Sequence, residues 1–179
     1  MEERFTLKNG QTVLIRPAAA EDASALADFF HNCGGESDFL SFGAEDCPYT
    51  EEYALQFIRC GTEFPDNLLL LAFADNKIVA ELSLCAPARK RFAHRLELGI
   101  AVSRPFWRQG LGSHLMSLAI RHGERHGIDS VFLTVSAENE AGIRLYRRFG
   151  FTEYGRYERQ ALIRGEYSDA LLMSRYLTR

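Results

Sequence analysis

The 179-residue sequence lacks the features that mark several large classes of protein. Its four cysteines, Cys33, Cys47, Cys60 and Cys85, form no CxxC pair and match no zinc-binding template. No apolar run reaches the roughly 18 residues that a membrane span needs, and the first ten residues contain no apolar signal core. We therefore expect a cytoplasmic chain with reduced thiols, no bound metal and no membrane contact.

An excess of positive charge is also missing. The chain has 21 Lys and Arg against 24 Asp and Glu, a formal net charge of −3. A protein that binds nucleic acid usually carries a basic field, so this class is disfavoured. There is no internal repeat, low-complexity segment or linker, and we expect a single domain over residues 1–179.

Alternating apolar patterns and turn signals do occur, and they predict the order of strands and helices. In chain order we expect a hairpin at 5–16 turned at Asn9-Gly10, a helix at 21–30, a loop at 32–48, a helix at 51–60 stopped by Gly61, strands at 67–74 and 77–86, a strand from 96, a helix at 111–126, a strand at 130–136, a helix at 139–149, and strands at 151–163 and 167–177.

The strand–helix–strand–helix run in the middle requires a parallel crossover, while the flanking strands form antiparallel hairpins. The predicted fold class is α/β (α+β in some schemes). We expect a mixed, mostly antiparallel, twisted sheet of about seven strands with helices on both faces.

Residues 96–112, LELGIAVSRPFWRQGLG, are the stretch most indicative of function. They predict a strand that stops by Pro105, a tight turn, and a helix that begins through Gly110 and Gly112. The first N–H groups of a helix have no internal partner, so this turn is suited to an anion such as a phosphate. It lacks the third glycine of GxGxxG and the GK[ST] of a P-loop, and two close glycines also occur for packing alone.

A second pattern follows about 30 residues later: residues 139–151 read NEAGIRLYRRFGF after a strand. Together the two patterns resemble the GNAT N-acetyltransferases. That family's pyrophosphate motif, Gln/Arg-x-x-Gly-x-Gly/Ala, is matched by Trp107 to Gly112, and its NxxAxxLYxxxGF motif is matched by Asn139 to Phe151. The resemblance covers residues 13–177. Trp107 stands where Gln or Arg is usual, and Gly142 replaces the usual Ala.

The resemblance implies an acetyl-CoA-dependent acyltransferase in which an amine attacks the thioester directly in a ternary complex, without a metal. It also implies the GNAT fold, with a central parallel strand pair splayed by a β-bulge near residues 98–100. The residues it implies for binding acetyl-CoA are Ile100, Ala101, Val102, Arg108, Gln109, Gly110, Leu111, Gly112, Ser113, Asn139 and Tyr146.

Two residues are implied for proton transfer. Tyr146 matches the family's general acid, which protonates the departing thiolate; on its own it reads as an ordinary core aromatic. Glu97 is the candidate general base, because it alternates with Leu96 and Leu98 and so is able to face the acceptor. A solvated strand glutamate, Glu81 on the neighbouring strand, and a chain of waters are the alternatives. A backbone N–H near the bulge is implied to polarise the thioester carbonyl.

The acceptor is expected to be a small-molecule or peptide amine, with the loop at 34–49 and the turn at 164–167 as candidate recognition segments. Protein N-termini, lysines, polyamines, amino acids and antibiotics all stay open, as does the choice between monomer and homodimer. Arg144, Arg147 and Arg148 suggest a solvated helix face or a site for the 3′-phosphate of CoA. The alternative function is an acyl-CoA-binding module without turnover, which the presence of Asn139 and Tyr146 disfavours.

Overall fold

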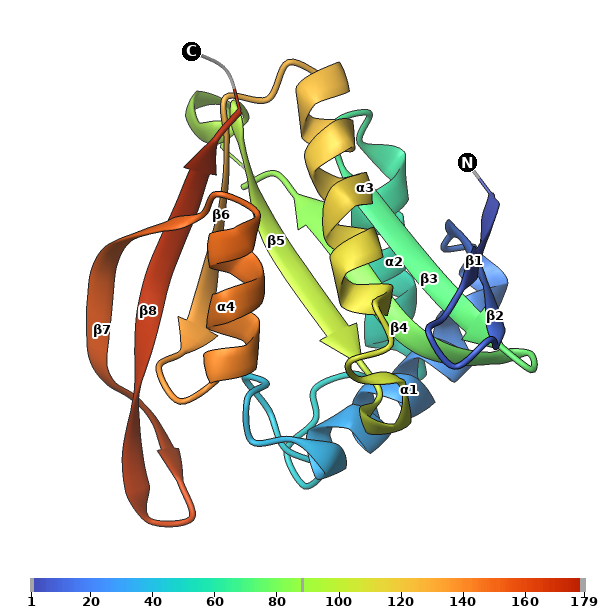
Figure 1. The fold of residues 1–179 in the computed structure, drawn as a ribbon, viewed down its shortest axis with the longest axis horizontal. Coiled ribbons are helices and arrows are strands. Elements are labelled where there is room, and N and C mark those ends of the chain that lie inside the picture. Colours follow the sequence, from blue (N-terminus) through green and yellow to red (C-terminus); the bar gives the residue numbers. More distant parts are fainter. Residues whose placement is uncertain (1, 88, 178–179) are drawn as a thin grey trace.

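The computed structural model describes residues 2–87 and 89–177, which form one open sheet covered by helices (Figure 1). There are eight strands rather than about seven. They are β1 (Glu3–Thr6), β2 (Thr12–Pro17), β3 (Leu68–Ala74), β4 (Lys77–Cys85), β5 (Arg95–Val102), β6 (Ser130–Ser136), β7 (Thr152–Ile163) and β8 (Glu166–Tyr176). The four α-helices are α1 (Ala23–Glu36), α2 (Glu51–Glu63), α3 (Leu111–Arg125) and α4 (Glu140–Arg148). Three short 3₁₀ turns are η1 (Ala20–Asp22), η2 (Lys90–Phe92) and η3 (Arg104–Phe106).

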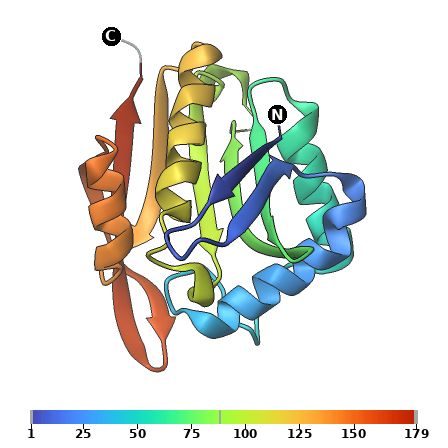
Figure 2. The same ribbon diagram turned by 45° about the vertical axis from the view of Figure 1, so that its right-hand side comes forward.

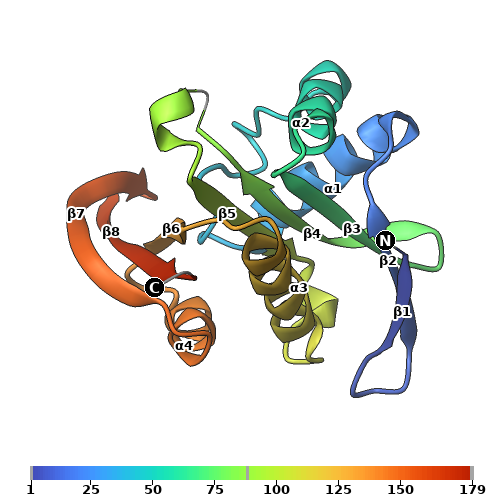
Figure 3. The same cartoon turned by 90° about the horizontal axis from the view of Figure 1, so that it is seen from above.

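The strands lie in the order β1-β2-β3-β4-β5-β6-β8-β7, and every neighbouring pair is antiparallel except β5 and β6. Helices α1 and α2 cover one face of the sheet, and α3 and α4 cover the other (Figure 3). This arrangement confirms the predicted fold class, a mixed and mostly antiparallel sheet with helices on both faces.

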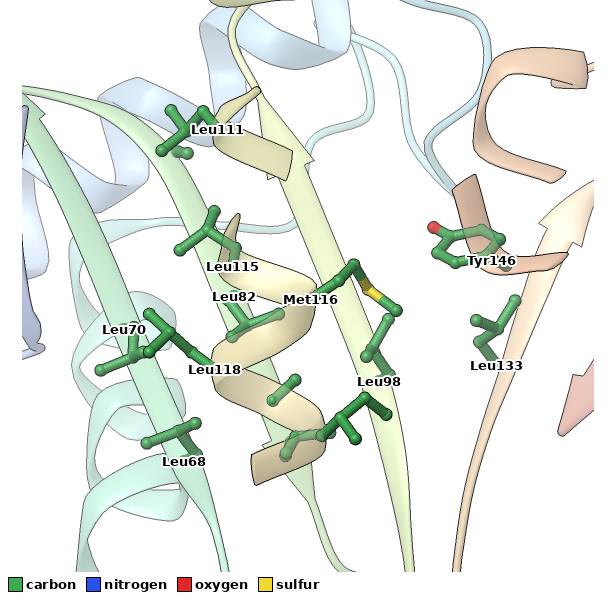
Figure 4. Close-up of a cluster of buried hydrophobic side chains, with 14 of the residues drawn as sticks. Leu68, Leu70, Leu82, Leu98, Leu111, Leu115, Met116, Leu118, Leu133 and Tyr146 are labelled. Carbon is green, nitrogen blue, oxygen red and sulfur yellow. The ribbon is translucent and has the colours of Figure 1, made fainter. Parts of the chain in front are cut away.

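The core beneath α3 is built from leucines of the central strands. Leu68, Leu70, Leu82 and Leu98 meet Leu111, Leu115, Met116 and Leu118 from the helix (Figure 4). These helix positions recur at the spacing that keeps side chains on one face of an α-helix. Full burial of each such side chain stabilises the fold by about 1.5–3 kcal/mol, so this layer holds α3 firmly at a fixed place on the sheet.

Two helices extend beyond the ends that the sequence predicted. Helix α1 continues to Glu36, through the start of the expected loop at 32–48, because Cys33 and Gly34 are buried. A Cβ on Gly34 would lie 2.8 Å from the backbone of Gly43, so only glycine permits this close approach. Helix α2 likewise passes Gly61, where a Cβ would lie 2.6 Å from that of Leu69. Both predictions were wrong because tertiary packing, rather than turn formation, requires these glycines.

Strands β5 and β6 pair over only three residues. The parallel register joins Arg95, Leu96 and Glu97 to the residues 130–132, and beyond this point the strands separate (Figure 1). The expected splay is therefore present, but the bulge expected near residues 98–100 is not found in the ladder of β4 with β5, which keeps one register from Glu97 to Val102. Instead β6 follows β8 along its whole length, while β5 follows β4.

None of the helices within the described residues is both long and apolar enough to cross a membrane.

Candidate active site

The turn from η3 into α3 has the backbone shape of an anion-binding loop. Arg108 and Gly110 both have positive φ, 61° and 91°, and Gly110 is the N-cap residue of α3. The carbonyl of Gly110 accepts the N–H of His114 at 3.0 Å, so the helix starts directly after the glycine. The first turn of α3 contains no acidic residue. The N–H groups and the dipole at this end of the helix are therefore available to a negatively charged ligand.

The β1–β2 hairpin holds this loop from one side (Figure 2). The backbone N–H of Lys8 donates to the carbonyl of Gln109 at 3.2 Å, and that of Asn9 donates to its side-chain oxygen at 3.1 Å. Phe5 stacks on the ring of His114, with 4.1 Å between the ring centroids. The side chain and the carbonyl of Gln109 therefore both hold the loop against the β1–β2 hairpin.

Trp107 ties the loop to the end of β5. Its indole Nε1 donates to the carbonyl of Val102 at 2.6 Å, and the guanidinium of Arg104 lies 5.9 Å from its ring centroid. The residue is 39% exposed. The aromatic side chain that departs from the usual motif thus anchors this loop to the strand that precedes it.

The end of α4 meets the start of α3. Arg148 donates from Nη2 to the hydroxyl of Ser113, and a Cβ on Gly112 would lie 3.6 Å from Leu145. Arg144 instead pairs with Glu140 on its own helix at 2.9 Å. Of the three arginines on α4, Arg148 is therefore the one that reaches the loop, a contact that the sequence left open.

The free edge of β5 lies where β6 turns away. In an antiparallel ladder the backbone groups of successive residues point alternately to opposite sides. The N–H of Ser103 points to β4, because it donates to the carbonyl of Val79 at 2.9 Å. The alternation directs the backbone of Ile100 and Val102 toward the side of β6, and that of Ala101 toward β4. The carbonyl of Val102 already accepts the indole N–H of Trp107, so an extended ligand arm placed here would pair with Ile100 and with the N–H of Val102 in the manner of an added strand.

Tyr146 lies on the inner side of α4 and is 8% exposed. Its ring is 6.0 Å from that of Phe151, and its hydroxyl points toward the side of β5 and α3 (Figure 4). Burial raises the pKa of Tyr146 to about 12, so the hydroxyl keeps its proton throughout the neutral range. The side chain therefore presents a protonated hydroxyl toward the separated strands.

Asn139 caps α4. Its side-chain oxygen accepts the N–H of Gly142 at 2.9 Å, and a Cβ at that glycine would lie 2.8 Å from the Asn139 amide nitrogen. The glycine thus allows the asparagine side chain to fold over the first helical turn. The amide nitrogen of Asn139 is left to donate elsewhere.

The two glutamates considered as bases lie on the same face of the sheet but differ in exposure. Glu97 is exposed, whereas Glu81 is 3% exposed beneath the helices α1 and α2. Burial raises the pKa of Glu81 to about 8, although a hydrogen bond with Ser83 opposes the shift. Its Oε1 has no hydrogen-bond partner within residues 2–87 and 89–177. Of the two, only Glu97 is open to a molecule arriving from solvent.

An open cavity of about 540 Å³ lies where the expected recognition segments meet. Its lining includes Glu36 at the end of α1, Asp38 and Phe39 just after that helix, Arg104 and Trp107 from the turn before α3, and Glu138 and Arg164. Arg164 in the β7–β8 turn donates to Asp38 at 3.0 Å, which joins the two segments directly. The cavity carries charge of both signs.

The described part of the chain contains no cluster of three or more side chains suited to a metal ion. The adjacent His122 and His126 stack at 4.1 Å and both contact Asp66, one through its carbonyl and one through its carboxylate.

Comparison with known proteins agrees with this geometry. Residues 35–151 match the acetyltransferase (GNAT) family. The L-amino acid N-acetyltransferase AaaT of Escherichia coli is 33% identical over 107 residues, which is 59% of this chain and 66% of that protein. A solved acetyltransferase of the GNAT family from Streptococcus pneumoniae is 32% identical with a TM-score of 0.86, and covers 93% of this chain and 99% of its own. A phosphinothricin acetyltransferase from Sinorhizobium meliloti in complex with acetyl-CoA shares the fold at 20% identity, a TM-score of 0.81, and coverage of 92% and 88%.

Proposed function

The chain belongs to the acetyltransferase (GNAT) family, and we propose that it transfers the acetyl group of acetyl-CoA to a primary amine by direct attack in a ternary complex. One arrangement supports the proposal. Strands β5 and β6 separate beyond Glu97, the glycine-containing turn before α3 lies at the open end, and Tyr146 faces the separated strands from α4.

The residues at the open end fit the charge and shape of CoA. Gly110, the N-cap residue of α3, has a left-handed backbone and no side chain of its own, and Arg148 adds a cation beside Ser113. The backbone N–H groups of Arg108 to Ser113 would hold the pyrophosphate. Ile100 and Val102 would pair with the pantetheine arm, and the amide nitrogen of Asn139 would donate to it.

Acetyl-CoA supplies the acyl group as a thioester and departs as a thiol. Glu97 takes one proton from the acceptor ammonium and passes it to solvent, which frees the nitrogen lone pair. The amine adds to the thioester carbonyl, which forms the C–N bond and puts the negative charge on oxygen; the C–S bond then breaks as the carbonyl reforms. Tyr146 donates a proton to the departing sulfur and regains one from the amine nitrogen, so the net products are the amide, the free thiol and one proton. A backbone N–H on the free edge of β5 stabilises the oxyanion.

A non-catalytic acyl-CoA-binding module is the second candidate, favoured by the same loop. It requires neither a buried hydroxyl facing the separated strands nor an exposed carboxylate on β5, yet both Tyr146 and Glu97 are present.

The test is incubation of the purified protein with acetyl-CoA and a panel of amines. The panel should include amino acids, a polyamine, and a peptide with a free N-terminus. Thiol release together with mass-detected acetyl-amine supports transfer. Tight binding of acetyl-CoA without an acetylated product from any amine supports the binding module.

A further inference from the structure

The guanidinium of Arg95 is held between two aromatic rings. Its central carbon lies 5.0 Å from the ring centroid of Phe92 in η2 and 4.9 Å from that of Phe132 in β6. The Nε atom is buried without a hydrogen-bond partner, and none of the ion pairs among the described residues includes Arg95. Rings on a guanidinium fix its plane and leave its N–H edge for a ligand. Arg95 is therefore an oriented cation without an anion.

Arg95 shares a face of β5 with the candidate base. Side chains of a strand alternate, and Leu96 and Leu98 are buried in the core beneath α3. Arg95 and Glu97 therefore point to the opposite face, separated by about 6.6 Å along the strand. Neither is in an ion pair with the other or with another described residue. One small molecule on this face is able to contact both side chains.

This part of the face lies beside the helices rather than under them. Helices α1 and α2 pack against β3 and β4, and Ala101 is the one residue of β5 in their hydrophobic cluster (Figure 3). Glu97 is consequently exposed and Arg95 is half-buried. The face is open toward solvent on the side opposite α3, where the acceptor must approach in the proposed reaction.

The cation of Arg95 beside the carboxylate of Glu97 suits a zwitterion, a molecule with a carboxylate next to an ammonium group. A carboxylate accepts two parallel N–H bonds from the edge of a guanidinium, and an amine beside it would then lie toward Glu97. A polyamine would place a second cation near Arg95 and be repelled. A peptide N-terminus would offer a neutral amide where Arg95 needs an anion.

We propose that the acceptor is a free amino acid whose carboxylate binds Arg95 while its amine faces Glu97. This inference rests on the proposed acetyl transfer and adds the class of acceptor. Arg95 is in this account a specificity-determining residue that contacts substrate.

The experiment compares each standard L-amino acid with its matching C-terminal amide, and measures thiol release from acetyl-CoA. The variant Arg95→Met removes the charge and keeps an unbranched apolar side chain between the rings. Arg91→Met, which removes an exposed charge in η2, is the matched control. The wild type should favour the best amino acid over its amide by more than tenfold in kcat/KM. Arg95→Met should lower kcat/KM for that acid at least tenfold, mainly through KM, and leave the amide within about twofold; Arg91→Met should change neither.

A purely structural role for Arg95 predicts a different result: Arg95→Met would lower activity on acid and amide alike. That result, or a wild-type preference for an amide, spermidine or an alanine-initiated peptide, overturns the inference while acetyl transfer itself stands. If thermal unfolding shows that Arg95→Met is not folded, Arg95→Lys takes its place. This variant keeps the positive charge but loses the two parallel N–H donors of the guanidinium. It should raise KM for the amino acid and leave KM for the amide unchanged. Absence of product from every amine, with acetyl-CoA bound, refutes the proposed function instead.

Discussion

Glu97 is the last residue of β5 that pairs with β6, and its partner there is Phe132. The point at which the parallel ladder ends therefore carries the exposed carboxylate, and Phe132 also stacks on Arg95. One residue pair thus marks the boundary between the continuous sheet and the separated strands. The proposed reaction takes place at that boundary, with CoA on the side of the free edge and the acceptor on the side of Glu97.

Replacing Tyr146 by Phe should lower kcat more than tenfold, because the departing thiolate would lose its proton donor. Tenfold corresponds to about 1.4 kcal/mol in the barrier. The ring stays in place against Phe151, so the affinity for acetyl-CoA measured by calorimetry should change by less than about twofold. Tyr154→Phe, at an exposed tyrosine, is the control and should leave kcat unchanged. An unaltered kcat in Tyr146→Phe would refute its role as general acid.

Gly110→Glu should abolish binding of acetyl-CoA. The change puts a side chain and a negative charge at a backbone with φ of 91°, over the start of α3. Gly127→Glu is the matched control, since Gly127 also has positive φ, 67°, and follows the other end of the same helix with open space around it. Calorimetry should show loss of binding in the first variant alone. Equal losses in both would assign the effect to backbone strain rather than to the site.

Trp107→Phe keeps an aromatic ring and removes the indole hydrogen bond to Val102. A hydrogen bond of this kind contributes about 0.5–1.5 kcal/mol to stability, and the residue is partly exposed, so we expect a loss near the lower figure in denaturant unfolding. The loop would be held less firmly, and the Kd for acetyl-CoA should rise a few-fold. A Kd equal to that of the wild type would show that the loop keeps its shape without this contact.

The carboxyl of Glu81 should make stability depend on pH. Burial raises its folded pKa from 4.5 to about 8, so between these values the unfolded chain ionises this group and the folded chain does not. Unfolding then releases a proton, and the free energy of unfolding falls by up to about 1.4 kcal/mol per pH unit as pH rises through this window.

Glu81→Gln removes this titration. Its free energy of unfolding should improve relative to the wild type as the pH is raised from 5 to 8, and the difference should level off above the folded pKa. Urea unfolding across this range measures the difference. A constant difference at all pH values would contradict the assignment.

Much of the fold followed from local pattern. The turn at Asn9-Gly10, the strand at Ser130–Ser136 and the start of α3 at Leu111 lie where the sequence placed them. These elements have strong local signals, namely a turn dipeptide, β-branched residues and an N-cap glycine. The ends of α1 and α2 were misplaced because Gly34 packs closely against Gly43 and Gly61 against Leu69, contacts between separate segments that local pattern does not reveal.

In the candidate site, too, local motifs were visible in the sequence, whereas contacts between separate elements were not. The loop at 108–113 and Tyr146 were named as candidate site residues from their motifs, and their roles stay predictions. Arg95, which we propose binds the acceptor, gave no signal of its own. The sequence predicts that β6 lies beside β5, but it does not show that the rings of Phe92 and Phe132 both reach the guanidinium of Arg95. The contact of Arg148 with Ser113 likewise joins two helices and has no local signal. The sequence showed that Arg148 is basic, but it did not show that Ser113 is its partner.

The central claim is transfer from acetyl-CoA to an amine in one ternary complex. Initial rates measured over a grid of acetyl-CoA and acceptor concentrations test it most directly. The account predicts double-reciprocal lines that intersect, with one acetylated amine formed for each thiol released. Parallel lines, which indicate a covalent acyl-enzyme, or thiol release without acetylated amine, would contradict it.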